Sequence, residues 1–193
     1  MIVCGGRENE NRNKLASGLT SLGNNDYCIL ADLDELPNPI KLDEARSLVD
    51  KHNQCVIQTV LFQQKANRVT WHGNDCHWWQ LTMFNKNTLD SYPNLQSIRS
   101  NGVKYAKQNR AIVFDAGWHF SSMGGPRQLK AKLNAYSHQE FNVPQIADSV
   151  DKVYNNGIDY VHRDYVRLVD NYPIDKLPPQ IFEVENYKEW FGV

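Results

Sequence analysis

The chain has 193 residues, of which 41% are hydrophobic and five are tryptophan. A chain of this length can bury an ordinary core, so we expect one domain over residues 1–193. The formal net charge is −1, and without a basic field we expect no nucleic-acid partner. No apolar run approaches the roughly 20 residues of a membrane span, and the apolar start is too short for a signal peptide, so we expect a cytoplasmic protein.

The four cysteines, Cys4, Cys28, Cys55 and Cys76, lie more than twenty residues apart, with no Cys-x-x-Cys pair among them. This spacing excludes the usual zinc-site and disulfide-framework patterns. We therefore expect reduced thiols, most of them buried.

Apolar periodicity in the first third of the chain predicts alternating helices and strands. Glu8–Leu22 carries an apolar helical face and is followed by Gly23, which predicts an amphipathic helix with a glycine C-cap. Tyr27–Ala31 is short and apolar, as in a buried strand. A second helix is expected after Pro39, and Gln54–Phe62 is predicted to form one long strand.

The rest of the chain continues this alternation with aromatic, strand-like segments and proline-initiated helices. The Gly124-Gly125 pair ends the strand predicted at Ala111–Ser122, and Pro126 fits the first turn of the helix that follows. The expected segments are Trp71–Phe84 and Ala111–Ser122 as strand-like, and helices running from Pro126 to about Tyr136 and from Pro144 to about Asn155. The order indicates an α/β protein.

Three carboxylates, Asp32, Asp34 and Glu35, follow the predicted strand directly, and prolines then stop the chain. Ligands in open α/β sheets bind at the carboxyl ends of strands. Clustered carboxylates repel one another unless a cation is present, and oxygen ligands suit Mg²⁺ or Mn²⁺. The pattern predicts a divalent-cation site that would hold a phosphate; the alternative is a solvated acidic turn.

A second candidate site is the strand-to-helix junction Ala116–Gly125, which contains His119 beside a tryptophan. Its glycines permit a tight turn, and the N–H groups of the next helix would favour a phosphate. An imidazole there could ligate a metal or donate to a phosphate, although a hydrogen-bonded core histidine is the alternative. The polar cluster on the following helix, Lys130, Lys132, His138 and Glu140, is also explained by a solvated face.

Taken in order, these motifs resemble those of glycosyltransferase family 17, the family of the β-1,4-mannosyl-glycoprotein 4-β-N-acetylglucosaminyltransferases. The matching segments are Glu10–Asn13, Asp32–Pro37, Ala116–Ser121, Lys132–Leu133 and His138–Asn142, with Gly157–Asp159 and Leu177–Pro179 further on. The resemblance covers about residues 8 to 180. Each motif is weak alone, whereas the Asp-x-Asp-Glu-x-Pro and Gly-Trp-His-Phe-Ser pair is specific.

The resemblance implies a GT-A-like fold: a single Rossmann-type mixed sheet flanked by helices. It implies an inverting transferase that moves a sugar such as N-acetylglucosamine from a UDP-linked nucleotide-sugar donor to a glycan acceptor, with Mn²⁺ or Mg²⁺. By this resemblance Asp32 and Asp34 hold the metal. The residues matched to the donor are Arg12, Asn13, Asp32, His119 and Lys132.

A carboxylate would remove the proton of the attacking hydroxyl, and Glu35 and Asp115 are the candidates for this base, with Asp75 also available. Two other functions stay open. One is a degenerate, non-catalytic module that binds nucleotide sugar or glycan. The other is a phosphatase of the haloacid-dehalogenase type, which also uses Asp-x-Asp but carries Thr or Val where this chain has Leu36.

Family members carry a strand and a helix upstream of the Glu-x-x-Arg-Asn helix, whereas this chain begins seven residues before it. The usual first strand and helix are then expected to be lacking. We expect Met1–Gly5 to be the remnant of the second strand, or the gene to be abbreviated and the donor site to be open on that side. A sheet without its first strand exposes edge N–H and C=O groups. We therefore expect either a homodimer that covers this edge or a monomer that binds nucleotide weakly.

Overall fold

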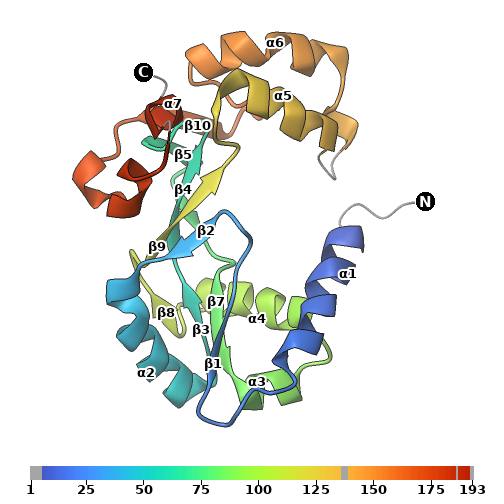
Figure 1. The fold of residues 1–193 in the computed structure, drawn as a ribbon, viewed down its shortest axis with the longest axis vertical. Coiled ribbons are helices and arrows are strands. Elements are labelled where there is room, and N and C mark those ends of the chain that lie inside the picture. The colour runs from blue at the N-terminus through green and yellow to red at the C-terminus, as the bar shows by residue number, and fades with distance from the viewer. Residues whose placement is uncertain (1–5, 136–138, 186, 192–193) are drawn as a thin grey trace. The chain divides into compact units, whose positions relative to one another are not determined.

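The computed structural model describes residues 6–135, 139–185 and 187–191. The predictions for Met1–Gly5, Cys4 and His138 therefore lie outside the described residues. The protein is a mixed α/β structure with two mixed sheets flanked by helices (Figure 1). The chain forms two compact units, which we call the first unit (residues 1–59 and 78–118) and the second unit (residues 60–77 and 119–193).

The chain passes between the units within three strands, β4, β6 and β9. The strands are β1 (Tyr27–Leu30), β2 (Glu35–Pro37), β3 (Gln54–Ile57), β4 (Thr59–Gln63), β5 (Arg68–His72), β6 (His77–Trp78), β7 (Thr82–Asn85), β8 (Ile112–Val113), β9 (Gly117–Ser121) and β10 (Val166–Asp170). The α-helices are α1 (Gly6–Lys14), α2 (Leu42–His52), α3 (Lys86–Ser91), α4 (Leu95–Lys107), α5 (Gly125–Ala135), α6 (Pro144–Asn155) and α7 (Tyr187–Phe191). The 3₁₀ turns are Leu15–Leu19, Pro39–Lys41, Gln139–Phe141, Ile174–Lys176 and Pro179–Phe182.

The sheet of the first unit has the strand order β1-β7-β3-β8, in which only β3 and β8 run parallel. The predicted strand at Tyr27 is confirmed, but the prediction that it is buried is wrong, since Leu30 is its one buried residue and Ile29 is 38% exposed. The reason is its position, because β1 is the edge strand of this sheet.

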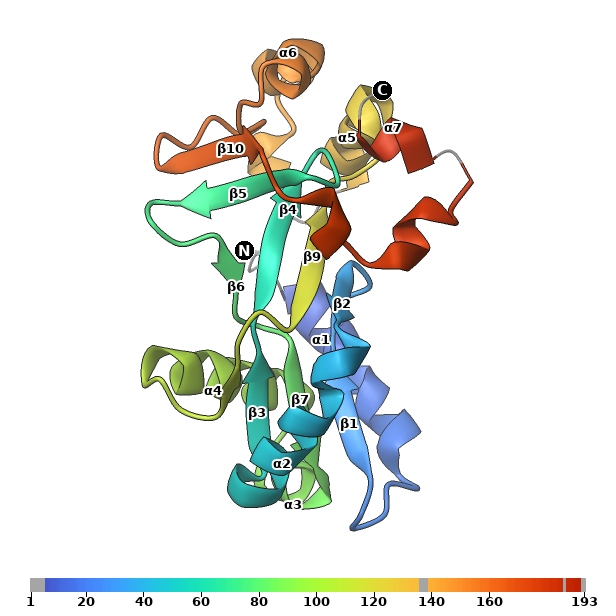
Figure 2. The same ribbon diagram turned by 90° about the vertical axis from the view of Figure 1, so that its left-hand side faces the viewer.

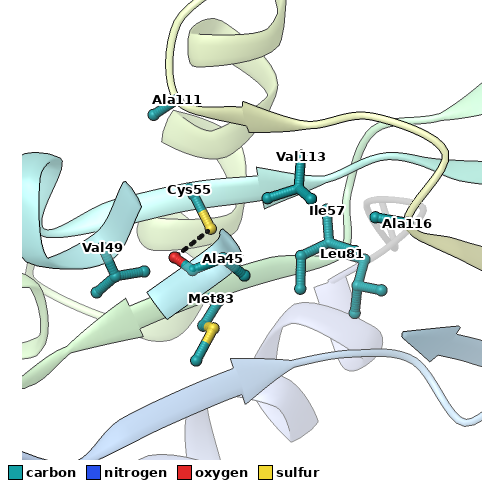
Figure 3. Packing of buried hydrophobic residues seen from close by; sticks show 9 residues of the cluster. All are labelled: Ala45, Val49, Cys55, Ile57, Leu81, Met83, Ala111, Val113 and Ala116. Atoms are coloured by element: carbon teal, nitrogen blue, oxygen red, sulfur yellow. Dashed lines mark hydrogen bonds between the residues drawn. The ribbon is translucent and has the colours of Figure 1, made fainter. Parts of the chain in front are cut away.

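Helices α2 and α4 cover opposite faces of this sheet (Figure 1). Successive side chains in a strand point to opposite faces. Cys55 and Met83 pack in the cluster that α2 completes, where the Cys55 thiol donates to the Ala45 carbonyl oxygen at 3.6 Å (Figure 3). Phe84, the next residue after Met83, instead packs with Ile98 of α4. The core of the first unit therefore has two layers, one on each side of the sheet.

The segment Gln54–Phe62 forms two strands instead of the single strand expected, because the chain changes partners at Gln58. The Gln58 N–H donates to Val113 O, and its carbonyl accepts from Ala116 N, both at 2.9 Å. Its side-chain Oε1 accepts from Asp115 N, also at 2.9 Å. Before Gln58 the chain pairs with β7 and β8, and after it the chain belongs to the second sheet. The expected single sheet is therefore divided in two.

The amphipathic helix predicted from Glu8 to Leu22 is shorter as an α-helix, which ends at Lys14 and continues as a 3₁₀ turn. In a 3₁₀ turn the residues i and i+3 lie above one another. Ala16 and Leu19 accordingly pack against the α4 layer, while Leu15 is 58% exposed.

The second sheet has the order β10-β5-β4-β9-β2, with β6 beside β4; Figure 2 shows β10, β5 and β4 next to one another. Within the second unit Phe62 stacks on Phe120 at 5.2 Å between ring centroids.

The predicted helix starts are confirmed, with Pro126 in the first turn of α5 and Pro144 at the start of α6. Buried residues of the layer formed by α5 and α6 are Leu129, Leu133, Val150, Val153 and Tyr160.

An ion pair between Arg68 and Asp170 in the second unit should make the stability of the protein fall at acid pH. Arg68 is 1% exposed and donates to both carboxylate oxygens of Asp170, with Nη2 at 2.8 Å from Oδ2. The hydrogen bond from Arg68 lowers the pKa of Asp170 below its usual value. Since the folded-state pKa is the lower one, this stabilisation is present above about pH 4 and is lost as the pH falls through the folded-state pKa.

We therefore expect Asp170→Asn to be less stable than the wild type at pH 7 and to lose less of its stability between pH 5 and pH 2. Urea unfolding at a series of pH values measures this difference. Asp43→Asn is the control, because the Asp43 side chain is 91% exposed. Parallel stability curves for the wild type and Asp170→Asn would contradict the prediction.

Candidate functional site

The turn that follows β1 places the predicted carboxylates at the carboxyl end of that strand. The Glu35 N–H donates to the Asp32 carbonyl at 3.0 Å, and Glu35 Oε2 accepts from the Asp32 N–H at 2.8 Å. These two hydrogen bonds close the turn from both ends. Leu33 at its tip is fully exposed, and Asp34 is half-buried. The three carboxylates thus belong to one short turn with a fixed backbone.

Two buried arginines hold the Asp32 carboxylate. Arg12 Nη2 lies 3.0 Å from Oδ1, and Arg99 Nη2 lies 2.7 Å from Oδ2. Arg12 and Arg99 are 8% and 1% exposed, whereas the Asp32 side chain is 37% exposed. Charge-assisted hydrogen bonds of this kind fix the direction of a carboxylate. Asp32 is therefore oriented from its buried side and is partly open to solvent.

Glu35 lies behind Asp32 and is the most buried carboxylate of the turn, with 2% exposure. Its Oε1 accepts from Trp78 Nε1 at 2.6 Å and from Arg99 Nη2 at 2.8 Å. Arg99 is held further by Gln80 Oε1, which accepts from its Nε at 2.8 Å. We call Arg12, Asp32, Glu35, Trp78 and Arg99 the carboxylate–arginine cluster.

Sequence reasoning missed Arg99, Trp78 and Gln80. A signal for Arg99 was present, because it lies at a core position of an apolar helical face at spacing i, i+3, i+4 and i+7, where a charged residue is unusual without a partner. The residues of this face, all of them buried, are Leu95, Ile98, Arg99 and Gly102. No comparable local pattern singles out Trp78 or Gln80.

The predicted pair Arg12 and Asn13 joins α1 to the first turn of α4. Arg12 Nη1 donates to Gln96 Oε1, and Asn13 Oδ1 accepts from the Gln96 backbone N–H at 3.0 Å. That N–H is one of the donors that a helix start leaves without an intrahelical partner. The structure thus brings Arg12 to Asp32 and gives Asn13 a capping role, while nucleotide binding by Asn13 stays a prediction.

Three other predicted residues lie outside this cluster. Asp115 is exposed in the turn between β8 and β9, with φ at 49°. His119 is buried in the part of β9 that belongs to the second unit, and Lys132 of α5 donates to Ser121 Oγ at 3.3 Å in the same unit. Their predicted roles toward a donor or an acceptor stay predictions.

The motif Gly157–Asp159 lines a pocket of about 300 Å³ within the second unit. Asp159 is buried there and accepts from Arg163 Nε at 2.8 Å and from Nη2 at 2.9 Å. His162 and Arg167 line the same pocket. The matched aspartate therefore holds Arg163, which lines the same pocket.

The turn offers carboxylates to a divalent cation, but the described residues do not supply a complete set of metal ligands. Within residues 6–135, 139–185 and 187–191, no group of three or more His, Cys, Asp or Glu side chains is arranged to hold a metal. Mg²⁺ bound with a nucleotide needs only one or two carboxylates, since phosphates and water supply the other ligands. Asp32 and Asp34, two residues apart on one turn, are of the residue type that such a site uses, and their binding of a metal stays a prediction.

Comparisons of the chain with protein-family models, with curated proteins and with solved structures find no match. The resemblance to glycosyltransferase family 17 thus depends on the motifs themselves. In the described part of the chain, none of the helices has both the length and the apolar character that crossing a membrane requires.

Proposed function

We propose that this protein is a metal-dependent, inverting glycosyltransferase of the family 17 type, which moves a sugar from a UDP-linked donor to a glycan acceptor. The observation that carries the proposal is Asp32, which leaves an α/β sheet at the end of β1 and is oriented by Arg12 and Arg99. A carboxylate at the carboxyl end of a strand supports the proposal, because ligands of α/β sheets bind at such strand ends.

The charges of the cluster also support a cation at this turn. Arg12 and Arg99 are balanced by Asp32 and Glu35, with which they form ion pairs. Arg12 also pairs with Glu8, so carboxylates already outnumber arginines before the charge of Asp34 is added, and a divalent cation would offset this excess negative charge. When bound, the cation would draw off the negative charge that develops on the departing diphosphate.

The contacts of Glu35 favour a positioning role over that of the base. A general base must reach the proton of the acceptor hydroxyl. Glu35 is 2% exposed, and its oxygens accept from Trp78, from Arg99 and from the Asp32 backbone. In the proposed enzyme Glu35 fixes the turn that carries Asp32 and Asp34, and Asp115 is the exposed carboxylate of the two predicted bases.

Asp34→Asn is expected to weaken Mn²⁺-dependent UDP binding by about tenfold or more, and its thermal midpoint shows that the variant is folded. Asp34 is preferred to Asp32 for this test, because removing the Asp32 charge would also disturb its two buried arginines. Isothermal titration with UDP, in Mn²⁺ and in EDTA, measures the effect. In EDTA the variant and the wild type should bind UDP equally weakly.

Asp43→Asn, which changes an exposed carboxylate on α2, is the matched control and should bind UDP as the wild type does. Unchanged Mn²⁺-dependent affinity in folded Asp34→Asn would refute the proposed site. Hydrolysis of UDP-sugars by the wild type distinguishes a transferase from a binding module, because a module would bind the donor without turnover.

A further inference from the structure

A second group of reactive side chains lies in the second unit, where β5 turns back. Gly73 has φ at 64° and begins the reversal. The His72 N–H donates to the Asp75 carbonyl at 2.8 Å, and the Asp75 N–H donates back at 3.3 Å. Cys76 follows, and its carbonyl accepts from Leu61 N of β4 at 2.9 Å. The backbone that carries Asp75 and Cys76 is therefore held on two sides.

At this turn the His77 imidazole contacts the Asp75 carboxylate on one side and the Cys76 thiol on the other. His77 Nδ1 lies 2.7 Å from Asp75 Oδ1, which also accepts the His77 backbone N–H at 3.0 Å. When Nδ1–H donates to the carboxylate, Nε2 of the neutral imidazole becomes the acceptor. That Nε2 lies 4.0 Å from Cys76 Sγ, at the outer limit of a sulfur hydrogen bond.

Two other cysteines of the described chain, Cys28 and Cys55, have thiol pKa values above the ordinary value, which disfavours the reactive thiolate. Burial raises the pKa of the Cys55 thiol to about 12. Burial, with a contribution from the charge of Asp26, also raises the pKa of Cys28. Cys76 is partly exposed, and its thiol lies next to the His77 imidazole, which the Asp75 carboxylate orients. An adjacent imidazole favours the thiolate, which is the reactive form of cysteine.

We propose that Cys76 is a modification site that exchanges with low-molecular-weight disulfides, with His77 as the proton acceptor and Asp75 as the residue that positions it. Nε2 of His77 takes the Sγ proton, and the thiolate attacks one sulfur of the disulfide. The bond between Cys76 and that sulfur forms as the original S–S bond breaks, and the other half leaves as a thiolate that takes up a proton. One disulfide is consumed and one is formed, so no further oxidant is needed.

His72, the other histidine at this turn, does not compete for the proton. His72 is the last residue of β5, and its backbone is hydrogen-bonded to Asp75. Burial, together with the positive charge of Arg163, lowers the pKa of His72, so His72 is neutral when the thiol reacts near pH 7. The proposed exchange uses no residue of the carboxylate–arginine cluster.

The test uses the full chain and 5,5′-dithiobis(2-nitrobenzoate), an aromatic disulfide whose released thiolate is followed by absorbance. We expect a fast phase of one thiol whose rate rises with a midpoint below about pH 7.5, compared with about 8.5 for an ordinary cysteine. Cys76→Ser should remove this phase, whereas Cys4→Ser and Cys28→Ser should retain it. Oxidised glutathione followed by peptide mass mapping should place the mixed disulfide on Cys76.

His77→Asn should slow the fast phase about tenfold at pH 7 and move its midpoint toward about pH 8.5, and Asp75→Asn should have a smaller effect in the same direction. Thermal midpoints confirm that each variant is folded. A fast phase that persists in Cys76→Ser would overturn the proposal. A wild-type midpoint at or above about pH 8.5 would also overturn it, and that measurement needs no variant.

Discussion

Glu35→Gln is expected to lower the free energy of unfolding by about 3 to 5 kcal/mol, because it removes one partner of a buried ion pair. Arg99 is 1% exposed and would keep only Asp32 as a charged partner. The glutamine NH₂ group would also face a donor, since Trp78 Nε1 donates to Glu35 Oε1 and the Asp32 N–H donates to Oε2, and the one amide oxygen can replace only one of these acceptors. A glutamine of the same size therefore cannot satisfy these partners.

The matched control is Glu44→Gln on α2, where the carboxylate forms an exposed ion pair with Lys41 at 2.9 Å. Exposed pairs contribute about 0 to 1 kcal/mol, so this variant should unfold nearly as the wild type does. Urea unfolding gives both values, provided that the slope against denaturant is unchanged. Equal losses in the two variants would show that Glu35 is not the centre of a buried cluster.

The elements that the sequence predicts well are those marked by local signals. Pro126 and Pro144 start helices because proline fixes φ and lacks the N–H that a first turn leaves unused. Gly124 and Gly125 form the predicted turn with φ at 92° and 84°, a region that suits glycine. In each case the decisive atoms lie within a few residues of the signal.

The division into two sheets depends instead on distant residues. An apolar run such as Gln54–Phe62 contains no mark for the point at which its pairing partners change. That point is set by Gln58, whose hydrogen bonds reach Val113, Asp115 and Ala116, more than fifty positions further along. Strand pairing of this kind is determined by tertiary contacts, and local patterns do not encode it.

The candidate site shows the same division between local and distant information. The Asp-x-Asp turn could be predicted, because an apolar strand runs directly into it. Its partners could not be predicted, because Arg12, Trp78 and Arg99 come from three other segments and meet only in the folded first unit. Such buried charges cost free energy unless each has a partner, so the cluster depends on all of its members.

Gly117→Ala is expected to lower the free energy of unfolding by about 3 kcal/mol, the upper end of the usual cost of overpacking. A Cβ at Gly117 would lie 2.4 Å from the Leu36 carbonyl oxygen and 3.2 Å from Pro37 Cα. Both are backbone atoms of β2, so neither can swing aside as a flexible side chain would. A third contact, Thr59 Cγ2 at 3.0 Å, closes the space from β4.

Gly18→Ala provides the control, because a Cβ at Gly18 meets nothing within 4 Å in the 3₁₀ turn Leu15–Leu19. That change should leave stability equal or raise it by up to about 1 kcal/mol, since alanine loses less conformational freedom on folding. In Gly117→Ala the displaced β2 begins at Glu35, so Mn²⁺-dependent UDP binding should weaken together with stability. If Gly117→Ala is as stable as Gly18→Ala, the close approach of β9 to β2 is not required by the fold.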